Sequence, residues 1–502
     1  MSTARATACK LPRVSNPREV VRRQFLAAAG KGIGGLLVLS AARAARTYAA
    51  SERLRLAVFG NMYNAAHFLT ASHIYNADVA AVCNVDRRKI PPILKSWAEQ
   101  AAKLGQAQDA AARSAAERYR RMAQGEGVKV LADIRQLFAA MADEFDALVV
   151  SEYDHLHAVA CGGALRAGKP VCSERPLGLT IREARALRAL AAETKLPTTY
   201  RSPGTATAQF RRAIELVQDG AIGQVREAHI WFKRGGPDRD AAPQGKQDVP
   251  EGLNWDLWLG PLPWRDYHAD WMSYAHWRET SNGGLGSFGP HTAIFPFLAL
   301  GLRELWDAPD AAIRVQAECS RLNRISFPRW ERVRWELPAR KGMPAVAVTW
   351  HHGPDYAPGA RELVHGKLRA VGIATPEEAD SLMKGAGSIL IGAEGALVAD
   401  DHSANVAALP REKFEKAETA RPQRIGASRG IYTDWIDSCR GAKPPILATF
   451  DNGGPLSELL MLGNIATQFP GQALTYHPAA GRLDGPPEAG GMLGYQYRDG
   501  WQ

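Results

Sequence analysis

The polar residues with the clearest chemical pattern follow two apolar runs between residues 145 and 176. The first run, residues 147–150, leads into a polar turn, and a helix-period segment and a Gly-Lys-Pro turn come next. The second run ends in a Glu-Arg-Pro triplet. This is a strand–helix–strand unit, and open parallel sheets bind ligands just beyond the carboxyl ends of their strands. We therefore expect ligand contacts from Ser151, Asp154, His155, Glu174 and Arg175.

A second candidate site is the turn after the first apolar strand. A dinucleotide site needs glycines there, because the pyrophosphate must approach the backbone at the start of a helix. Gly60 fills the first glycine position and Ala65 is an accepted variant at the third, but Met62 stands where the phosphate should come closest. The turn alone leaves dinucleotide binding open, and its candidate contacts are Gly60, Asn61, Met62 and Asn64.

Apolar runs alternate with helix-period segments from Leu54 to Tyr200. We expect strands at residues 54–60, 79–85, 128–131, 145–150 and 197–200, and helices at 134–142 and 181–194. Residues 93–124 also have helical character. This alternation predicts a doubly wound parallel sheet, that is, an α/β Rossmann-type N-terminal domain.

The pattern changes from residue 224 onward. Strand-like segments at 224–233, 313–317, 333–337, 345–350, 388–392 and 396–399 outnumber helical ones, at about 429–439 and 454–467. This composition predicts an α+β C-terminal domain on a mostly antiparallel open sheet. The predicted organisation is a leader at residues 1–50, a dinucleotide-binding domain at 51–202 and a substrate-binding domain at 203–502.

Two segments resemble one family of oxidoreductases. The runs DHLHAVACGGALRAGKPVCSERPLGLT (154–180) and SNGGLGSFGPHTAIF (281–295) are similar to the Gfo/Idh/MocA family. The resemblance implies a Rossmann domain that binds NAD or NADP beside a domain that binds a small-molecule substrate. In that family a Glu-Lys-Pro lysine touches cofactor and substrate, and an aspartate and a histidine four residues later face the substrate. Here Arg175 replaces the lysine, Ser287 replaces the aspartate, and His291 fits the histidine.

The end of the second strand bears on the choice of cofactor. By the family pattern, the acid that would bind the ribose falls at Asn84, with Asp86 two residues later. A neutral Asn84 followed by two arginines suits a 2′-phosphate and favours NADP, although an exposed basic turn explains the same residues. Asn84, Asp86 and Arg87 are therefore candidate cofactor contacts, with NAD or NADP left open.

The resemblance also assigns catalytic roles. Arginine stays protonated at any working pH, so Arg175 can orient an oxygen or stabilise an oxyanion but cannot act as a general base. The base role then falls on His291, because an ordinary histidine pKa of about 6.5 suits it. A buried structural histidine is the alternative.

Seven aromatic residues fall within residues 255–277, interspersed with charged side chains. Flat rings beside hydrogen-bonding groups suit a sugar, whereas core packing or a subunit interface explains the same density. The segment also resembles secreted, carbohydrate-acting branches of the family. The candidate substrate contacts are Trp255, Tyr267, Trp277, Arg278 and Ser287.

Residues 1–50 contain nine Lys and Arg against one Glu, so they carry eight of the ten net positive charges. The nearly neutral remainder disfavours a nucleic-acid partner. Arg22-Arg23-Gln24-Phe25-Leu26, followed by small and apolar residues, is typical of a twin-arginine signal, although an amphipathic or disordered arm is the alternative. We predict a periplasmic or otherwise extracytoplasmic protein that engages the twin-arginine export machinery. Cysteine and histidine spacing predicts no metal site.

Together these features predict an NAD(P)-dependent oxidoreductase that acts on a sugar or sugar derivative by hydride transfer. A redox-neutral NAD-dependent glycosidase is one alternative, because a retained cofactor needs no exchange outside the cytoplasm. A non-catalytic carbohydrate-binding protein on a degenerate dehydrogenase scaffold is another, motivated by Met62, Arg175 and Ser287. Whether the chain forms a homo-oligomer is left open.

Overall fold

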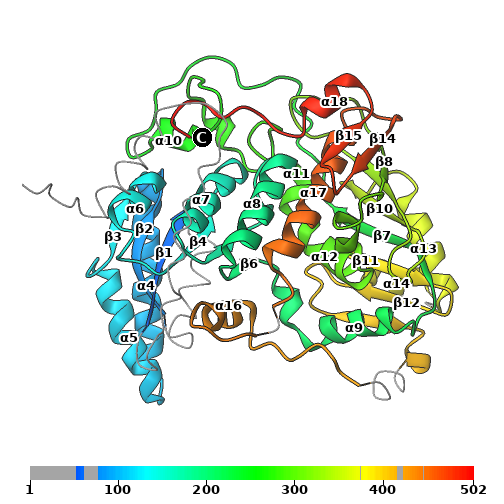
Figure 1. Cartoon of the computed structure of the whole chain (residues 1–502), viewed down its shortest axis with the longest axis horizontal. Helices are drawn as coiled ribbons and strands as arrows, with labels where there is room; N and C mark the ends of the chain where they lie inside the picture. The colour runs from blue at the N-terminus through cyan, green and yellow to red at the C-terminus, as the bar shows by residue number, and fades with distance from the viewer. Residues whose placement is uncertain (1–52, 61–76, 373–374, 415–421, 445, 502) are drawn as a thin grey trace, which may run out of the picture.

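The computed structural model describes residues 53–60, 77–372, 375–414, 422–444 and 446–501. In these residues two β-sheets lie at opposite sides of the molecule, with helices between and around them (Figure 1). The predicted leader, and the helix expected directly after Gly60, lie outside the described residues.

The first sheet is parallel throughout. Its spatial order is β3-β2-β1-β4-β5-β6, which is the doubly wound order of dinucleotide-binding domains. The strands are buried apolar runs, as expected for a sheet that is covered on both faces. They are β1 (Leu54–Gly60), β2 (Ala77–Cys83), β3 (Lys129–Leu131), β4 (Ala147–Ser151), β5 (Val171–Ser173) and β6 (Thr198–Tyr200).

Helices connect these strands, and side-chain caps fix where several of them begin. Asp109 and Asp133 accept backbone N–H groups at the starts of α5 and α6, and Thr180 and Glu183 form a capping box at the start of α8. The helices of this region are η1 (Arg87–Lys89), α4 (Ile90–Gly105), α5 (Ala110–Ala123), α6 (Ile134–Ala140), α7 (Asp154–Arg166) and α8 (Ile181–Thr194).

The second sheet has the order β13-β12-β11-β7-β10-β9-β8-β14-β15 and is antiparallel except for the β7–β10 pair. In β9 the apolar side chains of Val333, Trp335 and Leu337 are buried, while the residues between them face outward. The strands are β7 (Val225–Lys233), β8 (Ile313–Cys319), β9 (Glu331–Leu337), β10 (Val346–Gly353), β11 (Ala386–Gly392), β12 (Ala396–Ala399), β13 (Val406–Leu409), β14 (Ala473–His477) and β15 (Arg482–Asp484).

The remaining helices surround this sheet or link it to the first one. They are η2 (Pro203–Ala206), α9 (Ala208–Gln218), α10 (Trp255–Leu259), η3 (Ala269–Met272), α11 (Gly283–Ser287), α12 (Gly289–Ala299), η4 (Leu302–Trp306), α13 (Ala360–Ala370), α14 (Pro376–Leu382), α16 (Ile431–Cys439), α17 (Phe450–Ala466) and α18 (Pro487–Gly491).

Helix α17 joins the two halves and lies beside α8 (Figure 1). Its glycines permit the close approach: a Cβ at Gly453 would lie 2.7 Å from the ring of Tyr200 in β6. A Cβ at Gly463 would lie 2.7 Å from the ring of Trp335 in β9. A helix that touches both sheets in this way fixes the space between them, where the predicted site residues lie.

The structure confirms the predicted fold class: a parallel Rossmann-type sheet and a second, mostly antiparallel sheet. The predicted ranges for β1, β12 and α8 agree with the structure at both ends, and β2 starts two residues earlier than expected. The sequence prediction missed α12, because Pro290 and Pro296 interrupt its pattern although both are accommodated in the helix. The proposed domain limits at residues 50 and 202 stay predictions.

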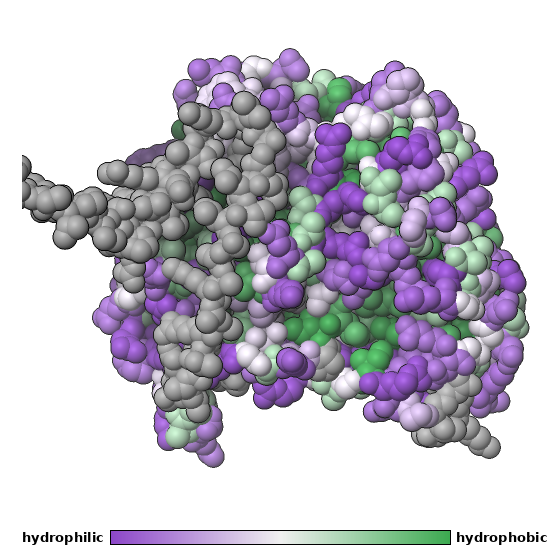
Figure 2. All heavy atoms as spheres, viewed as in Figure 1, coloured by the Kyte–Doolittle hydropathy of each residue, from purple (hydrophilic) through white to green (hydrophobic). Residues whose placement is uncertain are grey.

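No helix among the described residues is long and apolar enough to cross a membrane. Figure 2 shows polar and charged side chains over much of the viewed face, with smaller apolar areas between them.

Candidate active site

The carboxyl ends of the central parallel strands bring several predicted residues to one edge of the first sheet. β1 ends at Gly60 and β4 at Ser151, while Glu174 directly follows β5 and Arg201 directly follows β6. The strand order reverses between β1 and β4, which is where open α/β sheets bind ligands. The polar side chains at this edge form the candidate active site.

Arg175 lies at the centre of this group. Its guanidinium forms an ion pair with Glu174, whose other carboxylate oxygen lies 3.1 Å from Nε of Arg201. Arg201 also donates to the hydroxyl of Tyr432. Burial, together with the positive charge of Arg201, lowers the pKa of Arg175. One carboxylate is thus shared by two guanidinium groups.

Asp154 is fully buried at the first turn of α7. Its Oδ2 accepts a 2.8 Å hydrogen bond from the backbone N–H of Asn282, which precedes α11 in the second half of the chain. Burial raises the pKa of Asp154 to about 7, although Asn282 and the charge of Arg175 oppose this effect. Asp154 therefore links the two halves of the molecule and also lies within electrostatic range of Arg175.

His291 belongs to the first turn of α12 and is buried. Its backbone oxygen accepts a 2.7 Å hydrogen bond from Ser403, and its ring lies 4.6 Å from the ring of His402, measured between centroids. Burial, with the charges of Arg175 and His402, holds the pKa of His291 well below its usual value. The imidazole is consequently neutral at pH 7 and keeps a lone pair that can accept a proton.

Four of the predicted side chains keep a buried polar atom that has no hydrogen-bond partner among the described residues. These atoms are Oγ of Ser151, Oδ1 of Asp154, Nε of Arg175 and Nδ1 of His291. Buried polar groups in folded proteins are nearly always paired, so unpaired donors and acceptors in one region indicate a place that a polar ligand fills.

Tyr274 lies within electrostatic range of Asp154, Arg175 and Arg234, and neither Tyr274 nor Arg234 was predicted as a site residue. Tyr274 is 52% exposed, unlike most of the aromatic residues around it. Only its exposure and its charged neighbours distinguish it, and neither can be read from the local sequence. Arg201 was also missed, although the strand-end argument used for Glu174 extends to it.

The predicted cofactor residues are placed as follows. Asn61, Met62 and Asn64 lie outside the described residues. Asn84 donates to the backbone oxygen of Gly60 at 2.7 Å and accepts from the backbone N–H of Asp86 at 2.9 Å. The carboxylate of Asp86 caps η1, and its Oδ1 lies 2.7 Å from Nε of Arg88. The side chain of Arg87 is exposed. The side chains of Asn84 and Asp86 are thus hydrogen-bonded within the protein. Their contact with the ribose of a dinucleotide stays a prediction.

The ends of β1 and β4 pack so closely that a glycine is needed at position 60. Its φ of 112° lies in the region that favours glycine, and a Cβ there would lie 2.5 Å from the backbone oxygen of Ser151. The unpaired Oγ of Ser151 is at the same strand end. The unpaired hydroxyl at this strand end is available to a nicotinamide dinucleotide, which would bind where the strand order reverses.

Glu152 directly follows β4, in the predicted polar turn, but was not predicted as a contact. It is buried, and burial raises its pKa to about 8. At neutral pH the carboxyl is therefore protonated and brings no negative charge toward the phosphates of a dinucleotide.

Three of the aromatic predictions need correction. Trp255, Tyr267 and Trp277 are buried in the main apolar core, and Trp255 packs face to face against Trp258 with ring centroids 4.6 Å apart. The indole N–H groups of Trp255 and Trp277 donate to the backbone oxygens of Arg265 and Asp270. These three rings therefore form part of the apolar core, which was the alternative explanation of the aromatic segment, and they present no open face to a sugar.

The side chains of Arg278 and His155 both form hydrogen bonds with other parts of the protein. The guanidinium of Arg278 donates to three backbone oxygens, of Asn323, Ser326 and Asn464, and to the hydroxyl of Thr467. Burial lowers the pKa of His155 to about 4, and its Nε2 lies 2.7 Å from the backbone oxygen of Trp258. Both side chains hold loops together. The buried ring of His155 is fully engaged with backbone oxygens, which corrects its predicted role as a cofactor contact, whereas Arg278 also lines the cavity described next and its substrate role stays a prediction. Ser287 is half-buried at the end of α11, one turn before His291.

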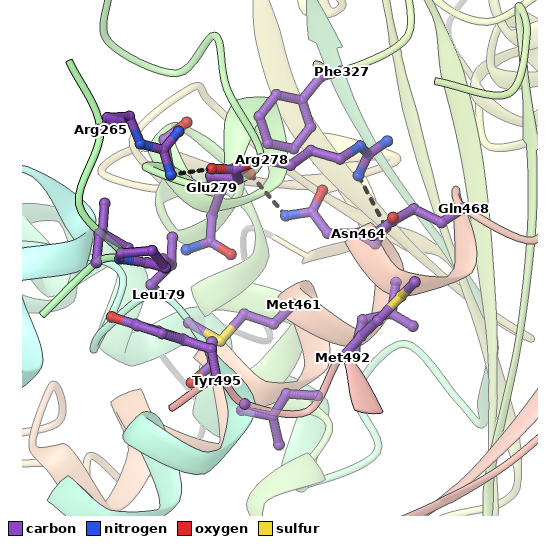
Figure 3. A pocket seen from close by; sticks show the side chains of 18 residues that line it. Leu179, Arg265, Arg278, Glu279, Phe327, Met461, Asn464, Gln468, Met492 and Tyr495 are labelled. Atoms are coloured by element: carbon purple, nitrogen blue, oxygen red, sulfur yellow. Dashed lines mark hydrogen bonds and ion pairs between the residues drawn. The ribbon is translucent and has the colours of Figure 1, made fainter. Parts of the chain in front are cut away.

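A separate cavity of about 530 Å³ lies between the start of α8, α17 and the C-terminal segment. Figure 3 shows the ion pair of Arg265 with Glu279 on one side and Met461, Met492 and Tyr495 on the other. Asn282 lines this cavity and also holds Asp154 through its backbone, whereas Arg175, His291 and Tyr274 do not line it.

The geometry of the parallel sheet agrees with the comparison to known families. Residues 59–201 match the Gfo/Idh/MocA oxidoreductase family. The family is described as an oxidoreductase family with an NAD-binding Rossmann fold, and the matched region contains the end of β1, all of β2 to β6 and the polar strand ends described above. The predicted cofactor class, a nicotinamide dinucleotide, is confirmed at this level. Among curated proteins, no sequence matches.

Solved structures extend the fold similarity over most of the chain. The WlbA dehydrogenase of Chromobacterium violaceum, crystallised with NADH and UDP-GlcNAcA, is 14% identical and covers 85% of this chain and 97% of its own, with a TM-score of 0.50. The WlbA dehydrogenase of Bordetella pertussis was crystallised with the same two ligands and is 13% identical. The matched region covers 84% of this chain and 98% of that protein, with a TM-score of 0.51. At these identities the similarity shows a shared two-domain fold.

Proposed function

We propose that the protein is an NAD(P)-dependent oxidoreductase of the Gfo/Idh/MocA type that acts on a sugar or sugar derivative by hydride transfer. One observation carries the proposal: Ser151, Asp154 and Arg175 keep unpaired buried atoms at the carboxyl edge of a Rossmann sheet, and His291, whose Nδ1 is also unpaired, lies within electrostatic range of Arg175. The family match of residues 59–201 supports the same reaction class.

The dinucleotide would lie along the edge formed by Gly60, Ser151 and Glu174. When bound, it supplies a nicotinamide ring that accepts or donates hydride. The chain itself must then hold the substrate carbon near that ring and manage the proton of the reacting hydroxyl group.

Arg175 and His291 divide that work. Nε of Arg175 has no protein partner among the described residues, so it can donate a hydrogen bond to the substrate oxygen. Nδ1 of His291 is also unpaired, and the lowered pKa keeps the ring neutral and able to accept the hydroxyl proton. The nearby guanidinium groups favour a substrate oxyanion as that proton leaves.

The test is turnover by the purified protein with NAD or NADP and a panel of aldoses, polyols and sugar acids. The account predicts reduced nicotinamide in proportion to oxidised sugar. His477→Gln, a change at a half-buried histidine that pairs with Asp484 in β15, is the matched control for changes at His291. If bound dinucleotide is present but no sugar is oxidised or reduced, hydride transfer to sugars is the wrong reaction.

The same assay separates the two alternatives. A redox-neutral glycosidase would cleave a glycoside with catalytic amounts of retained dinucleotide and no net reduced nicotinamide. A non-catalytic binding protein would bind sugar by calorimetry, show no turnover, and be unaffected by added NAD or NADP.

We also propose that the chain is exported by the twin-arginine machinery to an extracytoplasmic compartment. The support is the Arg22-Arg23 pattern and the concentration of positive charge in residues 1–50. Replacing both arginines by lysine should leave the protein in the cytoplasm on cell fractionation. Unchanged export of that variant would contradict the proposal.

A further inference from the structure

The cavity between the start of α8, α17 and the C-terminal segment has the size of a small-molecule site. Its volume is about 530 Å³, and ligand pockets typically measure about 300–1,000 Å³. Arg175 and His291 do not line it, so it is distinct from the candidate active site. The two are adjacent, because Asn282 lines the cavity and its backbone N–H donates a 2.8 Å hydrogen bond to Asp154. This cavity has no role in the proposed reaction.

Hydrogen bonds hold two walls of the cavity in place. The backbone N–H of Arg182 in α8 donates to the backbone oxygen of Leu493 at 2.8 Å, next to the lining residue Met492. On another wall, the guanidinium of Arg278 donates to the backbone oxygen of Ser326 at 2.9 Å. In Figure 3 Arg278 lies near the top of the view and Met492 lies below it. Because both walls are fixed by bonds within the protein, the cavity is preformed.

Asn464 on the cavity wall has a hydrogen-bond acceptor without a partner. The residue is 7% exposed, and its Nδ2 donates to the backbone oxygen of Asn282 at 2.8 Å. This bond fixes the orientation of the amide and leaves Oδ1 without a hydrogen-bond partner among the described residues. Buried polar atoms are nearly always paired, so Oδ1 indicates where a ligand would donate a hydrogen bond. Figure 3 shows this amide on the wall between Arg278 and Met461.

The charged groups that line the cavity are engaged within the protein. Arg265 forms an ion pair with Glu279. Nε, Nη1 and Nη2 of Arg278 each donate to a protein oxygen. The rest of the wall is largely apolar, with two flexible methionines that can adapt to the shape of a ligand: Leu179, Ile181, Leu262, Ile465, Met461 and Met492. This lining favours a neutral molecule with a large apolar surface.

We infer that the cavity is a second binding site, for a neutral and mostly apolar molecule that donates one hydrogen bond from a hydroxyl or amide N–H group. The donor pairs with Oδ1 of Asn464, and the apolar body covers the methionine and leucine side chains. A sugar would leave several hydroxyl groups against apolar side chains, which costs free energy. An anion would bring an unpaired charge to a wall whose charged groups already have partners. The inference does not depend on the proposed oxidoreductase function.

Three probes of nearly equal size test the chemistry of the site. The first, 2-naphthol, carries a hydroxyl donor, whereas 2-methoxynaphthalene lacks the donor and 2-naphthoate is an anion at neutral pH. Calorimetry with the purified protein measures the binding of each probe. We expect 2-naphthol to bind about three- to tenfold more tightly than the other two, as for one net hydrogen bond. Equal or tighter binding of 2-methoxynaphthalene or 2-naphthoate, or no saturable binding of 2-naphthol, would overturn the inference.

Two tryptophan variants test the location of the site. Gln468 and Met492 both line the cavity and are half-buried, so Gln468→Trp and Met492→Trp fill it from different segments. Each should weaken 2-naphthol binding at least about tenfold, because the indole occupies the space of the ligand. Gln472→Trp is the matched control, at an exposed position outside the cavity, and thermal unfolding shows which variants are folded. Parent-like affinity in a folded, filled variant, or an equal loss in the control, would overturn the inference.

Discussion

Arg175 shows how one substitution changes the chemistry of the site. A lysine at this position could exchange a proton, whereas a guanidinium stays charged and offers directed donors. Glu174 pairs with Nη1 of Arg175, and Nε has no hydrogen-bond partner among the described residues, which leaves it available to a ligand. Proton transfer must then belong to a neighbour, and His291 is the neutral candidate within range.

His291→Gln therefore tests the proton-transfer role. The amide keeps a polar group of similar size but cannot take a proton. We expect kcat to fall about 10²- to 10⁴-fold, the usual contribution of a general base, while the Kd for the dinucleotide stays the same. Stopped-flow turnover and fluorescence titration measure the two quantities. A fall in dinucleotide affinity with unchanged kcat would show a structural role instead.

Glu152→Gln tests the buried carboxyl beside the cofactor crevice. Its pKa is about 8 in the folded protein against an ordinary value of 4.5, so folding takes up a proton between these pH values. Stability is therefore lost as the pH rises from about 4.5 to 8 and is level above that. A glutamine does not ionise, so the variant should be more stable at pH 8, by about 1–3 kcal/mol, and equal to the parent below pH 4.5.

Thermal unfolding across this pH range measures the difference. Glu126→Gln, at an exposed position, is the control and should show no comparable pH-dependent gain. If Glu152→Gln changes stability equally at every pH, the carboxyl is not held protonated by the fold.

At the scale of elements, the end of β1 packs tightly against the end of β4, where the ligand is expected to bind. Gly60→Ala would place a Cβ against the backbone of Ser151 at an unfavourable φ. We expect about 3 kcal/mol or more of destabilisation and at least tenfold weaker dinucleotide binding. Gly168→Ala is the control, because its φ is 73° but nothing lies within 4 Å of its Cβ position. Denaturant titration should show a smaller loss of stability for Gly168→Ala than for Gly60→Ala. Equal losses in the two variants would mean that the close contact at Gly60 is unimportant.

Element patterns also explain how much the sequence could predict. β1 and α8 were predictable because an apolar run and a capping box mark their limits locally. The strand-end rule located Ser151, Asp154, Glu174 and Arg175. It could not show that Trp255 and Trp277 turn into the core while Tyr274 stays exposed, because all three lie in one aromatic-rich segment. Their orientation depends on residues far along the chain, such as Ser326, which pairs with Trp277 in an isolated bridge.

At the scale of the whole molecule, C-terminal segments complete the first half of the structure. Trp435 and Ile436 of α16 pack into the same apolar cluster as Val149 of β4 and Cys172 of β5. The main apolar cluster contains Phe59 of β1 together with Trp335 of β9, so the two sheets share part of one core, which predicts that they unfold together.

Trp435→Ala should lower the stability of the entire protein by about 3–5 kcal/mol, as for other large buried side chains, in one cooperative transition. Trp264→Ala, at a 62% exposed position, is the control and should cost far less. Calorimetry distinguishes the outcomes. A second, independent transition that is insensitive to Trp435→Ala would show that the halves unfold separately.

The central claim is that this chain holds a nicotinamide dinucleotide at the carboxyl edge of its first sheet. Native mass spectrometry tests it most directly, on full-length protein kept in the cytoplasm by replacing Arg22 and Arg23 with lysine. The account predicts one NAD or NADP per chain, released on denaturation. A mass without dinucleotide, unchanged after incubation with either cofactor, would contradict it.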